Sequence, residues 1–317
     1  MKNNVVNRPQ GRFRRKLRLI LRNYDLYLLL LPVAAYFIIF EYVPMYGVQI
    51  AFRKFSFKKG ILGSPWLNPW YSNFTRLFNS YYFERLITNT LSISLYSLAL
   101  GFPVPILLAL LLNEVNRPGF KKFVQTVTYA PHFLSTVVLV SIINALFSNS
   151  TGIVNNIIVA LGGERTAFLT RPEYFNSLYV ISGVWQNMGW NSIIYMAALS
   201  GIDPTLYEAG RVDGASRWQM MIHITLPSII PTICVMLILR CGSLMGVGYE
   251  KVFLMQNDLN ISASEVISTY VYKSGLINSE YGFSTAVGLF NSVINCILLV
   301  SVNMITRKVS EDEVRLF

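Results

Sequence analysis

Amide and aromatic side chains interrupt the apolar stretch at residues 177–200. They are the side chains of Trp185, Asn187, Trp190, Asn191 and Tyr195. Asn187, Asn191 and Tyr195 are spaced four residues apart, which places them on one face of an α-helix. Amides pair with hydroxyl groups both as donors and as acceptors, and indole and phenol rings stack on the apolar faces of sugar rings. This face therefore has the chemistry to bind a carbohydrate.

A second polar face lies in the apolar stretch at residues 283–305. Asn291 and Asn295 are again four residues apart. Polar side chains in lipid are costly unless they face a cavity or a partner, so two interpretations follow. Either the amides of both stretches line a polar pathway, or they bridge helices that small residues such as Gly183 and Gly189 bring close together. The sequence does not show which way either face points.

Arg240 is the one basic residue in the middle of an apolar stretch, at residues 228–247. A charge at that depth costs on the order of 3 kcal/mol on insertion scales, so its side chain must face water or a partner. Two roles follow for the guanidinium group. It binds an acidic sugar such as a uronate, or it pairs with a carboxylate of a second subunit. Of these two roles, the pairing is favoured.

A polar segment at residues 203–227 separates two of the apolar stretches. Asp203 is placed to cap a helix that begins at Pro204, because proline lacks the N–H that would be unpaired at the first helical position. Gly214 permits a sharp change of direction, and Pro227 is expected to end a second helix. Two short helices at an angle form a surface outside the bilayer that another protein can grip.

The order of residues in this segment resembles the EAA signature of permease subunits of ATP-binding-cassette (ABC) importers. The match begins at Glu208, continues through Asp213 and Gly214, and ends at Pro227. The resemblance implies that the helix around Glu208 sits in a groove of a separate ATPase subunit and moves with it. The expected coupling residues are Leu206, Tyr207, Glu208, Ala209, Gly210, Asp213, Gly214, Trp218 and Met221.

The elements that must position these side chains are helices long enough to cross a membrane. Of 317 residues, 53% are apolar and only 14% are charged. A spanning helix needs roughly 20 mostly apolar residues, and six stretches qualify. They lie at residues 26–44, 86–112, 123–147, 177–200, 228–247 and 283–305. Runs such as 107–112 have no polar face of helical period, which argues against buried helices of a soluble protein. We predict an all-α, polytopic membrane protein with six transmembrane helices.

The charge pattern predicts that both ends of the chain are cytoplasmic. Residues 1–25 form an arginine-rich tail, which favours the cytoplasmic side and contact with anionic lipid headgroups. Six spans return the second tail, residues 306–317, to the same side, and they place the segment at 203–227 there as well. The loop at residues 45–82 is also basic although this topology puts it outside.

Several classes of function are excluded by what the chain lacks. Its net charge is +11, but no basic groove interleaved with aromatic residues is present, so nucleic acid is not an expected partner. No Gly-x4-Gly-Lys-Ser/Thr phosphate loop occurs, and His132 and His223 have no catalytic partner by spacing. We therefore expect neither enzyme activity nor a cofactor in this chain, with ATP and magnesium bound by partner ATPase subunits.

The resemblance extends beyond the polar segment. The last five spans look like the core of sugar-type ABC importer permeases with the MetI-like fold, and residues 24–55 are similar to the LplB-like oligosaccharide and polysaccharide permeases. The family implies import of oligosaccharides across a bacterial cell membrane by ATP-driven alternating access. The implied partners are a second homologous permease, two ABC ATPase subunits and an extracytoplasmic solute-binding protein. Arg240 adds acidic, uronate-containing fragments as candidate substrates.

A channel subunit or a membrane-anchored scaffold would also accommodate the amide-rich stretches. Either would leave the segment at residues 203–227 without a purpose, and ABC exporters lack this signature. Co-purification with an ATPase distinguishes these classes from an importer.

Overall fold

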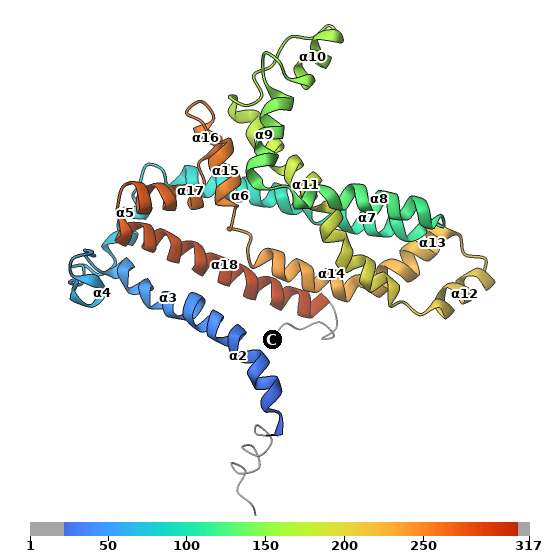
Figure 1. The fold of residues 1–317 in the computed structure, drawn as a ribbon, viewed down its shortest axis with the longest axis horizontal. Helices are drawn as coiled ribbons and strands as arrows, with labels where there is room; N and C mark the ends of the chain where they lie inside the picture. Colours follow the sequence, from blue (N-terminus) through green and yellow to red (C-terminus); the bar gives the residue numbers. More distant parts are fainter. Residues whose placement is uncertain (1–21, 310–317) are drawn as a thin grey trace, which may run out of the picture.

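The computed structural model describes residues 22–309 (Figure 1). Within this range the chain is helical, and the contact of strand type is an isolated bridge between Arg53 and Trp66. The all-α class expected from the sequence is confirmed. Most of the basic tail expected at residues 1–25, and most of the tail expected at residues 306–317, lie outside the described residues.

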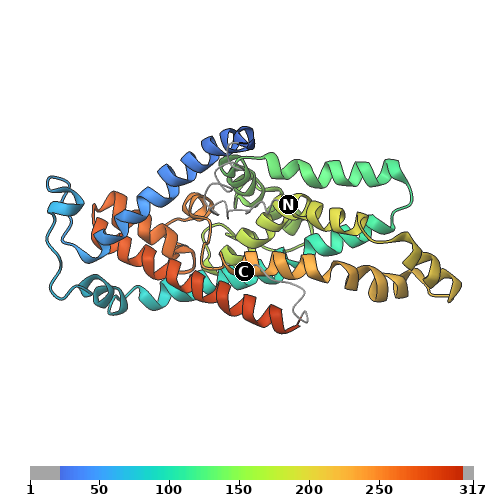
Figure 2. The same ribbon diagram turned by 90° about the horizontal axis from the view of Figure 1, so that it is seen from below.

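An apolar arm precedes the bundle. It is a continuous helical run of α2 (Tyr24–Phe37), the π-helix η1 (Ile38–Tyr42), α3 (Val43–Met45) and the 3-10 helix η2 (Tyr46–Phe52). No residue of α2 is buried, and Leu29 is 74% exposed. Figures 1 and 2 show the arm standing beside the bundle, which it contacts where η2 meets α18. Such an arm is suited to lipid or to a partner subunit.

The bundle is arranged around one long helix, α11 (Pro172–Ser200). It packs against α6 (Phe83–Gly101), α7 (Pro103–Glu114), α8 (Pro118–Tyr129) and α14 (Leu226–Cys241), and α14 packs in turn against α18 (Tyr281–Val309). Three apolar clusters fill the spaces between these helices, and Ile93, Ile229 and Val287 represent one cluster each, all at most 1% exposed.

Shorter elements form the connections. The first connection contains α4 (Gly60–Gly63) and α5 (Ser72–Phe78), and α10 (Ile153–Ala160) follows α9 (Thr136–Phe147). The last connection contains α15 (Tyr249–Met255), α16 (Ile261–Ser264), α17 (Ile267–Tyr272) and the π-helix η5 (Lys273–Ile277). α10 is followed closely by Gly162, whose φ of 86° suits the end of a helix.

Within residues 22–309, four continuous helical runs are long and apolar enough to cross a membrane. They are Tyr24–Phe52, Phe83–Glu114, Arg217–Cys241 and Tyr281–Thr306, and each covers most or all of one expected span. The expected span at residues 177–200 lies in α11, which has 29 residues but is not among these four, because amides and serines lower the hydropathy of its middle. The count of six spans therefore depends on α11 and on the bent pair Pro118–Phe133 and Thr136–Phe147.

The expected span at residues 123–147 is not one straight helix. Its two halves, Pro118–Phe133 and Thr136–Phe147, meet at an angle of 103°. The break follows the 3-10 turn η3 (Ala130–Phe133), which contains Pro131, and Ser135 starts α9 anew by accepting a hydrogen bond from the backbone N–H of Val138 at 3.3 Å. Proline and a side chain that caps a new helix favour such a break, although the residues on both sides are apolar.

The expectation that Pro227 ends a helix is wrong. The run Arg217–Cys241 is continuous through α13 (Arg217–Met220), the π-helix η4 (Met221–Thr225) and α14. The π turn, in which the Leu226 N–H donates to the Met221 carbonyl, lies directly before Pro227 and rearranges the hydrogen bonds that the proline would otherwise interrupt. The helix then ends at Cys241, short of residue 247, so Arg240 lies in its last turn and not in the middle of a span.

Candidate functional site

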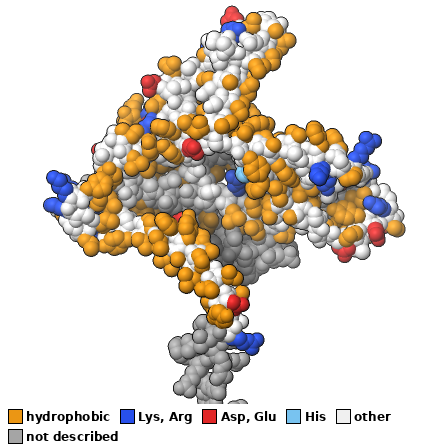
Figure 3. All heavy atoms as spheres, viewed as in Figure 1, with side chains coloured by type: hydrophobic (Ala, Val, Ile, Leu, Met, Phe, Trp, Pro, Cys, Tyr) orange, Lys and Arg blue, Asp and Glu red, His pale blue; other side chains and the backbone are white. Residues whose placement is uncertain are grey.

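The polar segment projects from one end of the bundle. Figures 1 and 2 show α12 (Pro204–Val212) and α13 at the same tip as the turn between α7 and α8. In Figure 3 hydrophobic side chains cover much of the visible face, and several charged side chains lie at this tip. The expected alternation of the spans puts the turn between α7 and α8 and the segment at residues 203–227 on one side of a membrane, and in the fold these two elements lie at the same tip.

Local sequence explains how the segment folds. Asp203 caps α12 by accepting a hydrogen bond from the Thr205 N–H at 2.9 Å, with Pro204 at the first helical position as expected. This bond to the Thr205 backbone holds the pKa of the Asp203 carboxyl below its usual value. Gly214 has a φ of 76°, a left-handed conformation that residues with a Cβ rarely adopt, so the turn between the two helices requires glycine.

Two features that were not predicted from the sequence stabilise the segment. Ser216 and Gln219 form a capping box, in which each side chain accepts a hydrogen bond from the other residue's backbone N–H, at 3.3 and 2.8 Å. The spacing Ser-x-x-Gln at residues 216–219 was the pattern in the sequence that could have predicted this capping box. In addition, the Tyr207 hydroxyl lies 3.0 Å from the Thr225 hydroxyl, and so ties α12 to η4.

The expected coupling residues divide between surface and interior. The exposed ones are Leu206, Glu208, Ala209, Asp213, Gly214 and Trp218, and the Trp218 side chain is 65% exposed. Gly210 is buried where a Cβ would lie 3.1 Å from Ile224, and Met221 is buried in the cluster around Ile229. The surface that remains is an apolar patch with charged neighbours, which has the composition of a docking site.

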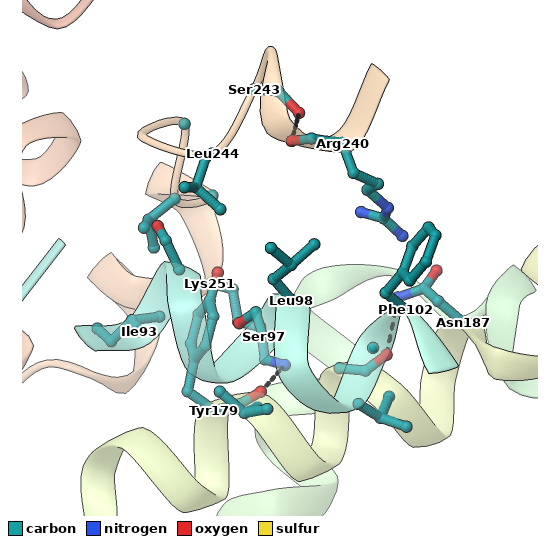
Figure 4. Close-up of a pocket in the computed structure, with 18 of the residues that line it drawn as sticks. Ile93, Ser97, Leu98, Phe102, Tyr179, Asn187, Arg240, Ser243, Leu244 and Lys251 are labelled. Carbon is teal, nitrogen blue, oxygen red and sulfur yellow. Dashed lines mark hydrogen bonds between the residues drawn. The ribbon is translucent and has the colours of Figure 1, made fainter. Parts of the chain in front are cut away.

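A second feature is a cavity of about 300 Å³ between α6, α11 and the chain after α14 (Figure 4). Of the expected pathway residues, Asn187, Asn191 and Arg240 line it. Figure 4 shows the Arg240 side chain pointing from α14 toward Phe102 and Asn187. No Asp or Glu is among the described residues that line the cavity, so its walls carry positive charge without a matching negative one.

Comparison with known proteins shows to which protein family the polar segment and the cavity belong. Residues 101–311 match the family described as the binding-protein-dependent transport system inner membrane component. This chain belongs to that family. The polar segment and the cavity are therefore parts of a transport permease, as the resemblance noted above implies.

The permease has relatives of almost the same length. The polygalacturonan/rhamnogalacturonan transport system permease protein YteP of Bacillus subtilis (strain 168) is 44% identical over 308 residues, which are 97% of this chain and 95% of that protein. Protein LplB of the same organism is 44% identical over 287 residues, 90% of each chain. A chain in the crystal structure of a bacterial ABC transporter involved in the import of the acidic polysaccharide alginate superposes with a TM-score of 0.85, at 42% identity, over 93% of this permease and 99% of that chain.

Lys251 is a cavity residue of this permease that the sequence analysis missed. It lies in α15, within the last connection between the long helices, yet its side chain is only 9% exposed. Its Nζ donates a hydrogen bond to the Tyr179 carbonyl at 2.8 Å and lies 4.6 Å from the centre of the Tyr179 ring. Burial lowers the pKa of the Lys251 ammonium to about 8. No local pattern distinguishes it from a surface lysine.

Arg240 is exposed to the cavity and has no ion pair among the described residues. Its position in the last turn of α14 is favourable for a cation, because the unpaired carbonyl groups give that end of a helix a negative dipole. The cost of the charge is therefore smaller than its expected place in the middle of a span suggests.

Asn187 agrees with both interpretations of the amide-rich face, because its side chain lines the cavity and also bridges two helical elements. It lines the cavity, and its Oδ1 lies 3.0 Å from His132 Nδ1 on the neighbouring η3 turn. Its Nδ2 donates to the Gly183 carbonyl at 3.0 Å within α11. The amide therefore orders the cavity wall as well as presenting a polar group to it.

The remaining candidates lie away from this cavity. Trp190 stacks on His132 with ring centres 4.5 Å apart, and Trp185 is 42% exposed. Tyr195 is buried in the apolar cluster around Ile229, so the face it was expected to share with Asn187 and Asn191 turns from cavity to core along α11. Asn295 accepts a hydrogen bond from the Met245 N–H at 2.9 Å, which is bridging within the bundle. The buried Oδ1 of Asn291 has no hydrogen-bond partner among the described residues.

Proposed function

We propose that this permease imports acidic oligosaccharides, with the cavity lined by Asn187, Asn191 and Arg240 as part of their path. The observation that carries the proposal is the excess of positive charge in a cavity that also offers amides. A carboxylate paired with a guanidinium group forms charge-assisted hydrogen bonds, and amides complement sugar hydroxyls. The names of two relatives, one for polygalacturonan and rhamnogalacturonan and one for alginate, refer to polysaccharides that are acidic or contain acidic units, which supports the same substrate class.

Transport is driven through the segment at residues 203–227. The exposed side chains of Leu206, Glu208 and Trp218 bind a groove on an ATPase subunit, and Gly214 lets the two helices change their angle when that subunit moves. ATP and magnesium bind to the ATPase and not to this chain. The segment lies in the cytoplasm, as do both termini of the chain.

The full importer contains more than this chain. It comprises a second, homologous permease that completes the path, two ATPase subunits, and a solute-binding protein that delivers the sugar from outside. A neighbouring solved structure in complex with an alginate pentasaccharide-bound periplasmic protein supports the last partner. Rigid-body movement of the helices opens the path alternately to the two sides of the membrane.

The test is reconstitution of the complex in proteoliposomes. We expect ATP hydrolysis that depends on both the binding protein and an acidic oligosaccharide, and uptake of that sugar. Glu208→Ala should prevent binding of the ATPase subunit, or it should allow ATP hydrolysis without uptake of the sugar. The control is Glu164→Ala, which removes an exposed carboxylate from the loop after α10. Normal uptake by Glu208→Ala would contradict the coupling role, and uptake of neutral sugars alone would contradict the substrate class.

A further inference from the structure

We propose that Lys251 is a second carboxylate-binding residue of the cavity and that it selects sugars with a carboxylate over neutral ones. The inference rests on the proposed function, because it requires a sugar to pass this cavity. It adds a residue from α15, outside the spans and outside the polar segment, to the determinants of specificity.

The position of the ammonium group is the first argument. Lys251 reaches the surface of α11 in Figure 4, where the Tyr179 carbonyl and ring hold its Nζ. A Cβ on Gly183 would lie 3.3 Å from this Nζ, so a residue without a side chain keeps space next to the charge. The ammonium group is thus held in place at the cavity wall, and the Lys251 side chain does not extend into solvent as that of a surface lysine does.

The balance of charge is the second argument. An ammonium group has three hydrogens to donate, and among the described residues the hydrogen bond of Lys251 is the one to Tyr179. Burying a cation without an anion is costly. Arg240 lines the same cavity and adds a second positive charge. Among the described residues that line it, the cavity therefore has two cations and no anion.

Nearby carboxylates do not fill this role. Glu265 pairs with Arg85 and Lys273, and Glu280 pairs with Arg76. Glu250 is next to Lys251 in the sequence and Asp258 lies in the same connection, but both side chains are exposed. The acidic residues of this connection are thus committed elsewhere or face away, and a carboxylate on a passing sugar would supply the missing partner.

Selection follows from the fixed position of the Lys251 ammonium and from the unbalanced positive charge of the cavity. A carboxylate that reaches Lys251 forms a charge-assisted hydrogen bond with its ammonium group, whereas a neutral sugar of the same shape displaces water and leaves that charge unpaired. Discrimination between the two sugars is therefore expected to fall when the Lys251 charge is removed.

The experiment compares an oligogalacturonate with its methyl ester, which has the same backbone without the charge. Uptake of each is measured at pH 7 in proteoliposomes that contain the full complex with wild-type, Lys251→Gln or Lys251→Met permease. We expect the ratio of acid to ester uptake to fall about tenfold in both variants, as for loss of one charge-assisted hydrogen bond. The binding protein's own preference is the same in every sample and cancels in the comparison. Lys54→Gln, at an exposed position in the first connection, should leave the ratio unchanged.

Several outcomes would overturn the proposal. An unchanged ratio would show that Lys251 does not meet the carboxylate. An equal loss of uptake for both sugars would assign it a structural role, and so would failure of both variants to assemble. Failure of the proposed function looks different, because wild-type complex would then transport neither sugar or would not distinguish them.

Discussion

Gly189 of α11 lies against Thr128 of α8 so closely that a Cβ on the glycine would be 2.2 Å from the Thr128 carbonyl oxygen. Two further contacts hold the same region together: Gln186 donates to the Leu134 carbonyl at 3.0 Å, and His132 stacks on Trp190. The bent pair α8–α9 is thus fastened to the helix that carries the cavity amides. Movement of α11 would move the bend with it.

Gly189→Ala should therefore destabilise the permease. The added methyl group meets backbone atoms, which have little freedom to shift, so we expect a loss of about 3 kcal/mol. The measurement is thermal unfolding of the detergent-purified complex. Gly288→Ala, in α18 with no atom within 4 Å of the new Cβ, is the matched control. Equal stability of the two variants would show that α8 and α11 can separate at no cost.

Gly214→Ala tests the turn of the coupling segment. A φ of 76° costs a residue with a Cβ about 1–2 kcal/mol, so the angle between α12 and α13 should change or the segment should loosen. We expect less ATPase to co-purify and slower uptake. Gly119→Ala, near the start of α8, has open space and no left-handed φ, and should behave as wild type. If Gly214→Ala retained full uptake, the left-handed turn would not be needed for coupling.

Ser216→Ala tests the capping box without changing the glycine turn. Loss of the cap should cost about 1 kcal/mol of local stability and increase hydrogen exchange at the backbone of residues 217–220. Ser228→Ala removes a hydroxyl of α14 that donates to the Ile224 carbonyl of η4, and it should have little effect. Unchanged exchange in Ser216→Ala would mean that contacts such as Tyr207 with Thr225 are sufficient to hold this helix end.

Uptake of an acidic oligosaccharide should depend on pH through Lys251. Burial lowers the pKa of this ammonium to about 8, so it is charged below that pH and neutral above it. The other titratable side chains that line the cavity are Tyr179 and Arg240, and Arg240 keeps its charge throughout. We expect the ratio of acid to ester uptake to fall as pH rises from 7 to 9 in wild type and to stay level in Lys251→Gln. A parallel fall in both would assign the effect to another group.

The same pKa gives the sign of a stability effect. The pKa of Lys251 is lower in the folded state than its ordinary value of 10.5, so the folded state binds its proton less readily than the unfolded state. The charged lysine therefore opposes folding below pH 8, and this cost is relieved as the pH rises toward 10.5. Lys251→Met should remove that part of the pH dependence of thermal unfolding.

Several local features are predictable because their causes lie within a few residues. The cap formed by Asp203, the helix start at Pro204 and the left-handed turn at Gly214 each depend on backbone geometry at one position. Pro227 shows where this reasoning fails. A single residue type predicts an interruption, but the π turn before it allows the helix to continue, and that turn has no simple local signature.

The sequence by itself determined the membrane-spanning character, the helical class and the family, because apolar run length and an ordered motif are properties of the chain read along its length. The tertiary structure decided which polar groups share a cavity. Lys251 reaches it from a connection far along the chain, Tyr195 turns into the core, and Met221 is buried rather than offered to a partner. The direction in which a side chain points depends on which distant segments pack around it, and no spacing within one helix contains that information.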